Sequence, residues 1–217
     1  MVVKIVAIVA FSLLTLTLVV LKALKIGNRR RGVVKMLTAA LFVGLGVYGC
    51  VIQGGQLHIV LAVGLFFASM GDLFLVFMDN HKFFVAGVLS FALASTTLSV
   101  YAIMFYGWTF WALLPFAVMI ILNVVMQITK IYSFGKDVID LNIYTVCVSL
   151  CGSLGIAAAC SIGSVQAILF GVGCFMYMLS DVCLGLYLLK FRHRALDIVN
   201  TLLYFPGMLL IALSLIF

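Results

Sequence analysis

The sequence predicts an all-α integral membrane protein with eight transmembrane helices, and two observations carry this prediction. Of the 217 residues, 66% are hydrophobic and 9% are charged, with a mean hydropathy of +1.36. A soluble domain of this composition would expose large apolar patches, which soluble domains avoid. The apolar residues also form eight long stretches with short polar breaks between them. A stretch of about 20 apolar residues is long enough to cross a bilayer as a helix.

The expected spans follow one another without room for a separate soluble domain. They cover approximately residues 4–24, 33–53, 57–78, 83–106, 108–129, 141–161, 163–189 and 196–217. The breaks between them are, in order, NRR, QGGQ, DNHK, YGW, KIYSFGKDVID, SIGS and KFRHRA. Each break contains the glycine or polar residues that end an apolar run. We therefore expect a single polytopic domain over 1–217. The first stretch lacks a small-residue cleavage site, so we expect it to be a retained span rather than a signal peptide.

Basic residues predict the orientation. Most Lys and Arg residues fall in or beside the breaks after the first, third, fifth and seventh spans: Lys22, Lys25, Arg29, Arg30, Arg31, Lys35, Lys82, Lys130, Lys136, Lys190, Arg192 and Arg194. Loops rich in Lys and Arg face the cytoplasm, so we expect both termini to be non-cytoplasmic. The net charge of +7 is explained by these loops facing anionic membrane lipids, and no nucleic-acid partner is expected.

Two aspartates, Asp72 and Asp181, lie inside the third and seventh expected spans, where a charge is costly and usually functional. Both occur in the pattern F-x4-[GS]-D-x2-L, at residues 66–75 and 175–184. This faint repeat would fit two parallel four-helix halves. With a rise of about 1.5 Å per residue, both aspartates lie roughly 10–14 Å below the cytoplasmic edge. At equal depth in a compact bundle, the two aspartates could face each other as an aspartate dyad.

A facing pair would have a definite chemistry. Burial and like charge favour a state in which one carboxyl keeps its proton while the other is ionised. This arrangement provides a general acid beside a base or charge stabiliser. Ser69 and Ser180 offer hydroxyl groups, and Tyr177 lies one turn before Asp181 on the same helix face. Lys35, near the cytoplasmic start of the second span, could reach a phosphate or an aspartate.

Other uses of an intramembrane aspartate stay open at this point. Polar side chains also join membrane helices by hydrogen bonds, and they also carry protons or ions. The cysteines form no C-x-x-C pair and have no accompanying histidine cluster, so we expect neither a metal site nor another cofactor. The sequence also contains no G-x-S-x-G, P-loop or H-E-x-x-H motif.

Several positions together form a recognisable set. They are Lys35, the GDLFL segment at residues 71–75, Gly87 and Phe91, Tyr144, the Ser180-Asp181 pair, and the Tyr204-Phe205 pair. In order and spacing, the chain from about Lys35 onward resembles the lysoplasmalogenase (YhhN-like) family of eight-span membrane proteins. It departs from that family's pattern at three positions. Ser95 replaces a histidine, Leu98 replaces a tyrosine, and Met208 replaces a glutamine of the last span, while both aspartates are kept.

The resemblance implies a membrane hydrolase of lipid metabolism. The substrate would be a lysolipid with a vinyl ether bond, and the products would be a fatty aldehyde and a glycerophospho-alcohol. We expect Asp72 and Asp181 to be catalytic. The substrate-binding residues would be Lys35, Ser69, Tyr144, Tyr177, Ser180 and Tyr204. The phosphate would meet Lys35, Lys82 or the basic cluster at 192–194.

Two other functions stay open. One is a small proton-coupled transporter, and the other is a non-catalytic, lipid-binding member of the family. The expected partners are the lysolipid and membrane lipids. The expected location is a bacterial plasma membrane or a eukaryotic endoplasmic reticulum.

Overall fold

The structure is a computed structural model that describes residues 2–131 and 135–217, and these ranges are helical apart from short connections. The long helices are α1 (Val2–Ala23), α2 (Asn28–Gln53), α3 (Gln56–Val76), α4 (His81–Tyr106), α5 (Leu113–Ile128), α6 (Val138–Ile162), α7 (Val165–Leu186) and α8 (Arg194–Ser214). Three short turns accompany them: η1 (Phe110–Ala112), η2 (Gly135–Asp137) and η3 (Tyr187–Phe191). Within the described ranges, eight helices are long and apolar enough to cross a membrane. The predicted fold class is therefore confirmed, and the chain is a multi-pass membrane protein.

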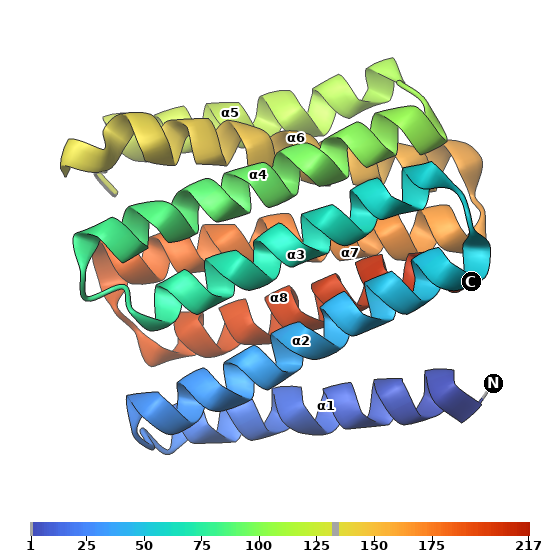
Figure 1. Cartoon of the computed structure of the whole chain (residues 1–217). Helices are drawn as coiled ribbons and strands as arrows, with labels where there is room; N and C mark the ends of the chain where they lie inside the picture. The colour runs from blue at the N-terminus through green and yellow to red at the C-terminus, as the bar shows by residue number, and fades with distance from the viewer. Residues whose placement is uncertain (1, 132–134) are drawn as a thin grey trace.

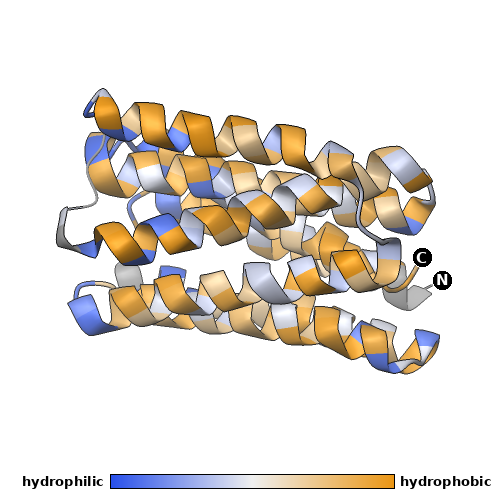
Figure 2. Cartoon of the chain, turned by 90° about the horizontal axis from the view of Figure 1, so that it is seen from above, coloured by the Kyte–Doolittle hydropathy of each residue, from blue (hydrophilic) through white to orange (hydrophobic). Residues whose placement is uncertain are grey.

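Consecutive helices are antiparallel, so their connections alternate between the two ends of the bundle (Figure 1). The connections after α1, α3, α5 and α7 lie at one end. We call it the basic end, because it holds the Lys and Arg residues at 22–35, at 82 and at 190–194. Both termini lie at the opposite end. Hydrophobic residues dominate the lengths of the helices, and hydrophilic residues gather near their ends (Figure 2). The cytoplasmic location of the basic end stays a prediction.

Seven of the helices pack in a closed ring. Following the contacts, α1 meets α2, then α3, α4, α6, α7 and α8, and α8 returns to α1. Helix α5 packs mainly on α6, outside this ring. Helices α7 and α8 meet tightly at Gly173 and Gly207, where an added Cβ would lie 2.7 and 2.9 Å from the facing carbonyl oxygen. Small residues of this kind let membrane helices approach closely.

The helix boundaries differ from the sequence prediction by up to five residues. Helix α2 begins at Asn28 rather than near residue 33, so the basic run at 29–31 is helical. Helix α5 begins at Leu113 rather than near residue 108, because Gly107 ends α4 with φ +83 and η1 follows. The seventh span ends in η3, a turn of π-helix, and Arg192 closes it in the left-handed conformation with φ +42.

Candidate active site at the basic end

Asp72 on α3 is held by a cation and a phenol. Its side chain is an acid, yet it is only 2% exposed. Lys35 of α2 places its Nζ 3.0 Å from Asp72 Oδ1. Tyr204 of α8 donates its hydroxyl to Asp72 Oδ2 at 2.8 Å. A cation and a hydrogen bond together offset the cost of burying a carboxylate. Side chains of α2 and α8 therefore fix the position of the Asp72 carboxyl on α3.

The glycine before Asp72 brings α3 and α4 together beside this carboxylate. A Cβ added to Gly71 would lie 2.7 Å from the ring of Phe91 on α4, which is closer than real contacts allow. The Phe91 ring packs edge-on against Tyr204, with centroids 6.0 Å apart and planes at 88°. Gly71 thus admits the ring that supports Tyr204, and Tyr204 binds Asp72.

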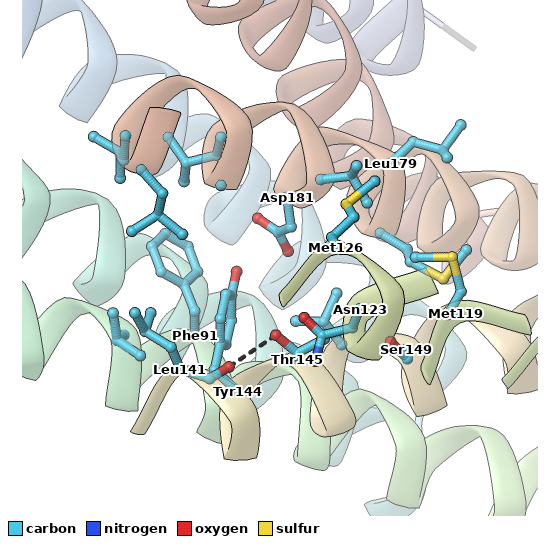
Figure 3. A pocket seen from close by; sticks show the side chains of 18 of the residues that line it. Phe91, Met119, Asn123, Met126, Leu141, Tyr144, Thr145, Ser149, Leu179 and Asp181 are labelled. Carbon is cyan, nitrogen blue, oxygen red and sulfur yellow. Dashed lines mark hydrogen bonds between the residues drawn. The ribbon is translucent and has the colours of Figure 1, made fainter. Parts of the chain in front are cut away.

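Asp181 on α7 has different surroundings. Its Oδ2 atom is buried and has no hydrogen-bond partner, and no ion pair joins Asp181 to a cation within residues 2–131 and 135–217. Tyr144 of α6 lies beside it, and Figure 3 shows both side chains at the wall of one cavity. The Tyr144 hydroxyl is also buried without a hydrogen-bond partner, although it is near enough to Asp181 to interact electrostatically. Asp181 therefore lacks the cation that Asp72 has.

Both aspartates line one cavity of about 300 Å³, which we call the two-aspartate pocket. Its polar lining includes Lys35, Asp72, Asp181, Tyr187 and Tyr204. The two carboxyls are also near enough to interact electrostatically. The fold thus brings together two acidic groups that are 109 residues apart in the sequence, at positions 72 and 181.

A second cavity, of about 220 Å³, adjoins the first and is almost entirely apolar. We call it the apolar pocket. Figure 3 shows its wall, which includes Met119 and Met126 of α5, Leu141 of α6 and Leu179 of α7. Asp181 is the one carboxyl in its lining. Five residues line both this pocket and the two-aspartate pocket: Leu75, Phe91, Asp181, Leu184 and Leu188. Asp181 therefore lies where an apolar and a polar space meet.

A third cavity, of about 420 Å³, lies next to the two-aspartate pocket at the basic end. We call it the basic pocket, and its lining is Lys22, Lys25, Arg31, Tyr187, Arg192, His193, Arg194 and Asp197. Four of these residues, Lys22, Arg31, Tyr187 and Asp197, also line the two-aspartate pocket. The three pockets therefore form a series with rising polarity toward the basic end.

The π-helical turn η3 contributes to all three pockets. Tyr187 lines the basic and two-aspartate pockets, Leu188 lines the two-aspartate and apolar pockets, and Leu189 lines the apolar pocket. Such turns are rare and occur often at functional sites. Sequence reasoning missed Tyr187, since the local sequence reads as a continuous apolar helix.

The structure gathers some of the predicted site residues and separates others. Lys35, Asp72, Asp181 and Tyr204 line the two-aspartate pocket, and Tyr144 lines the apolar pocket. Ser69, Tyr177 and Ser180 line none of the three pockets.

The hydroxyls of these three residues bond elsewhere. Ser69 donates to the Phe66 carbonyl at 2.8 Å, and Ser180 donates to the Tyr177 carbonyl at 2.6 Å. The Tyr177 hydroxyl lies 3.1 Å from that of Ser95. The geometry thus gives these side chains roles within and between helices.

Comparison with known proteins agrees with the motifs. A model of the YhhN family matches residues 30–215, a segment that contains both aspartates. The search of curated proteins found no match, and neither did the search of solved structures. Because the family match covers most of the chain, the protein belongs to the YhhN family, which includes lysoplasmalogenases.

Proposed function

We propose that the protein is a membrane hydrolase of the lysoplasmalogenase type, which cleaves the vinyl ether bond of a lysolipid to a fatty aldehyde and a glycerophospho-alcohol. One observation carries the proposal. Asp181 lies in the shared wall of a polar pocket that also holds Asp72 and of an apolar pocket beside it. A vinyl ether lysolipid likewise has an apolar part and a polar part, and its reactive bond joins the hydrocarbon chain to the glycerol.

The pockets fit the two parts of such a substrate. The hydrocarbon chain would occupy the apolar pocket, among Met119, Met126 and Leu179. The glycerol would occupy the two-aspartate pocket, near Asp72 and Tyr204. In this pose the vinyl ether lies at the boundary of the pockets, beside Asp181. Burial of the chain supplies affinity, and the polar groups fix its orientation.

The surroundings of the two carboxyls suggest different roles. Asp181 has no cation to stabilise an ionised form, so it is the better proton donor. Asp72 is bound by Lys35 and Tyr204, so it is the better carboxylate. Asp181 would protonate the alkene carbon that is distal to the ether oxygen. Asp72 would stabilise the resulting oxocarbenium ion by its negative charge.

Water completes the reaction. The water oxygen adds to the cationic carbon, and its released proton returns to Asp181. The hemiacetal formed in this way then breaks its bond to the glycerol oxygen, which takes up a proton, and an aldehyde remains. One water is consumed, and no electron acceptor or donor is required. The neighbouring Tyr144 hydroxyl is near enough to stabilise the Asp181 carboxylate between the two proton transfers.

The three departures from the family pattern lie outside these pockets. Ser95, Leu98 and Met208 are fully buried, and none of them lines any of the three cavities. Ser95 bonds to Tyr177 and to the carbonyl of Phe91 within the core. These substitutions therefore affect the packing behind the site rather than its lining, which supports retention of the activity.

The test is release of aldehyde from a defined 1-alkenyl lysophospholipid by the purified full-length protein. In deuterated water, protonation of the alkene carbon should place one deuterium on carbon 2 of the aldehyde, which mass spectrometry detects after rapid reduction to the alcohol. Asp181→Asn should lower turnover by about 100-fold or more, because general acid catalysis commonly contributes that much. Asp72→Asn should also lower turnover.

Two controls sharpen the experiment. Asp140→Asn changes an acidic residue of α6 that lines none of the three pockets, and it should leave turnover unchanged. A 1-alkyl lysophospholipid has no double bond to protonate and should not react. Full turnover in Asp181→Asn would remove the acid–base assignment. Proton-coupled solute uptake into proteoliposomes, without any aldehyde release, would instead support a transporter.

A further inference from the structure

The basic pocket has a large excess of positive charge. Five Lys or Arg side chains line it, together with His193, against the single acidic residue Asp197. Asp197 is already engaged, since its Oδ1 lies 2.6 Å from Lys22 Nζ. A cavity with this charge attracts anions. It adjoins the two-aspartate pocket, and Tyr187 lies in the wall of both.

Two of its basic residues have a strained backbone. Lys25 has φ +56 and Arg192 has φ +42, a region that L residues with a Cβ rarely adopt. Within the described parts of the chain, Lys130 is the only other residue besides glycines with positive φ. Each of these residues ends a helix, where the left-handed conformation is common. Both strained residues contribute to the same cavity from separate connections, after α1 and after α7.

The other nearby cations, Arg31 among them, already have interaction partners. Lys22 contacts Asp197 and donates to Thr201 at 2.7 Å, and Arg194 donates to the Ala23 carbonyl at 2.8 Å. Lys35 is bound to Asp72. By contrast, the side chains of Lys25 and Arg192 are exposed and form no ion pair within residues 2–131 and 135–217.

We infer that the basic pocket binds a phosphate group, and specifically the headgroup phosphate of the lysolipid, through Lys25 and Arg192. This inference rests on the proposed function for the identity of the lipid. It replaces two other candidates for the phosphate contact. Lys35 is engaged by Asp72, and Lys82 lines none of the three pockets. A guanidinium and an ammonium group are the usual donors to phosphate oxygens.

The order of the pockets matches the order of groups in the lipid. Hydrocarbon chain, vinyl ether, glycerol and phosphate would meet the apolar pocket, Asp181, the two-aspartate pocket and the basic pocket in turn. Tyr187 lies in the walls of the last two pockets, so its side chain borders the junction of glycerol and phosphate. Binding of the phosphate would then fix the position of the vinyl ether relative to Asp181.

A binding experiment tests this without relying on hydrolysis. The ligands are a 1-alkyl lysophospholipid and the corresponding 1-alkylglycerol, which share a chain and lack a scissile bond. The variants are Lys25→Asn and Arg192→Asn in the full chain, since asparagine tolerates positive φ better than most residues. Lys130→Asn is the matched control, because Lys130 has φ +54 at the same end of the bundle but lines none of the pockets.

Each pocket variant should bind the lysophospholipid about tenfold more weakly, as expected for the loss of one charge-assisted hydrogen bond. Binding of the alkylglycerol should be unchanged in all variants, and Lys130→Asn should resemble the unmodified protein. Equal losses for both ligands, or no loss for the lysophospholipid, would overturn the inference.

Inorganic phosphate is the second probe, because it shares the chemistry of the headgroup. It should displace the lysophospholipid only at concentrations at least about 100-fold higher, since it lacks the chain that the apolar pocket buries. If phosphate instead bound as tightly as the lipid and responded to the same variants, the pocket would be assigned to free phosphate. That result would overturn the inference that it binds the lipid headgroup. Absence of aldehyde release would refute the proposed function alone, because these ligands are never cleaved.

Discussion

Replacing Lys35 by methionine should lower the free energy of unfolding by about 3 to 4 kcal/mol, because it leaves the Asp72 carboxylate buried without its cation. Loss of one partner of a buried ion pair typically costs about 3–5 kcal/mol. Lys35 is 23% exposed, so solvent screens part of the interaction and the lower part of this range applies. Methionine keeps the length of the side chain, so little packing is lost.

The carboxyl can avoid the unpaired charge by taking up a proton, and this sets an upper bound. At pH 7, protonating a carboxyl of ordinary pKa, about 3.9, costs about 4 kcal/mol. The free-energy cost of an unpaired carboxylate and that of protonating the carboxyl are therefore similar. For a chain of this length, about 3 kcal/mol corresponds to a fall of roughly 6–12 °C in melting temperature.

The assay is a double-mutant cycle with Asp72→Asn, followed by thermal unfolding in one detergent. Asparagine can still accept the hydrogen bond from Tyr204, but it needs no cation. Lys35→Met should therefore have little effect in the Asp72→Asn background, and the coupling between the two changes should be about 3–4 kcal/mol. An equal loss of stability from Lys35→Met in both backgrounds would refute the ion-pair argument and point to lost packing of the lysine chain.

Three further predictions concern the structure behind the site. Gly71→Ala forces the Phe91 ring to move and should cost about 1–3 kcal/mol in detergent unfolding, whereas Gly44→Ala, which meets nothing within 4 Å, should cost nothing. Tyr177→Phe loses the hydroxyl contacts to Ser95 at 3.1 Å and to the Phe91 carbonyl at 3.4 Å, and it should lower stability by about 1–2 kcal/mol with unchanged KM for the lysolipid; a raised KM would contradict its separation from the pockets. Asn142→Ala removes two bonds of 3.0 Å that join α5 to α6, and it should speed hydrogen exchange in residues 113–128; unchanged exchange would show that apolar packing alone holds α5.

The sequence predicted the fold because the membrane imposes a simple rule. Each span must be long, apolar and helical, so composition and the position of the polar breaks are enough to count the helices. The helix starts were less predictable. Asn28 and the following arginines are polar enough to read as a loop, yet they extend the N-terminus of α2 beyond the apolar span, because backbone hydrogen bonding does not depend on hydropathy.

The candidate site was only partly predictable. Asp72 and Asp181 are conspicuous because little else in their spans carries charge. That Lys35 and Tyr204 both bind Asp72, leaving Asp181 without a cation, follows from the rotation of four helices about their axes. Hydropathy does not encode that rotation. The serines near the aspartates were reasonable candidates, but a serine hydroxyl in a membrane helix can bond its own backbone.

For the proposed reaction, the placement of the three pockets has a consequence for the release of the two products. The apolar pocket lies among helices of the membrane-spanning bundle, whereas the basic pocket lies at one end of it. An aldehyde with a long chain partitions into bilayer, and a glycerophospho-alcohol dissolves in water. Each fragment would depart into the phase that it prefers, and neither would have to pass the other. The two products would then leave by separate routes, one into lipid and one into water.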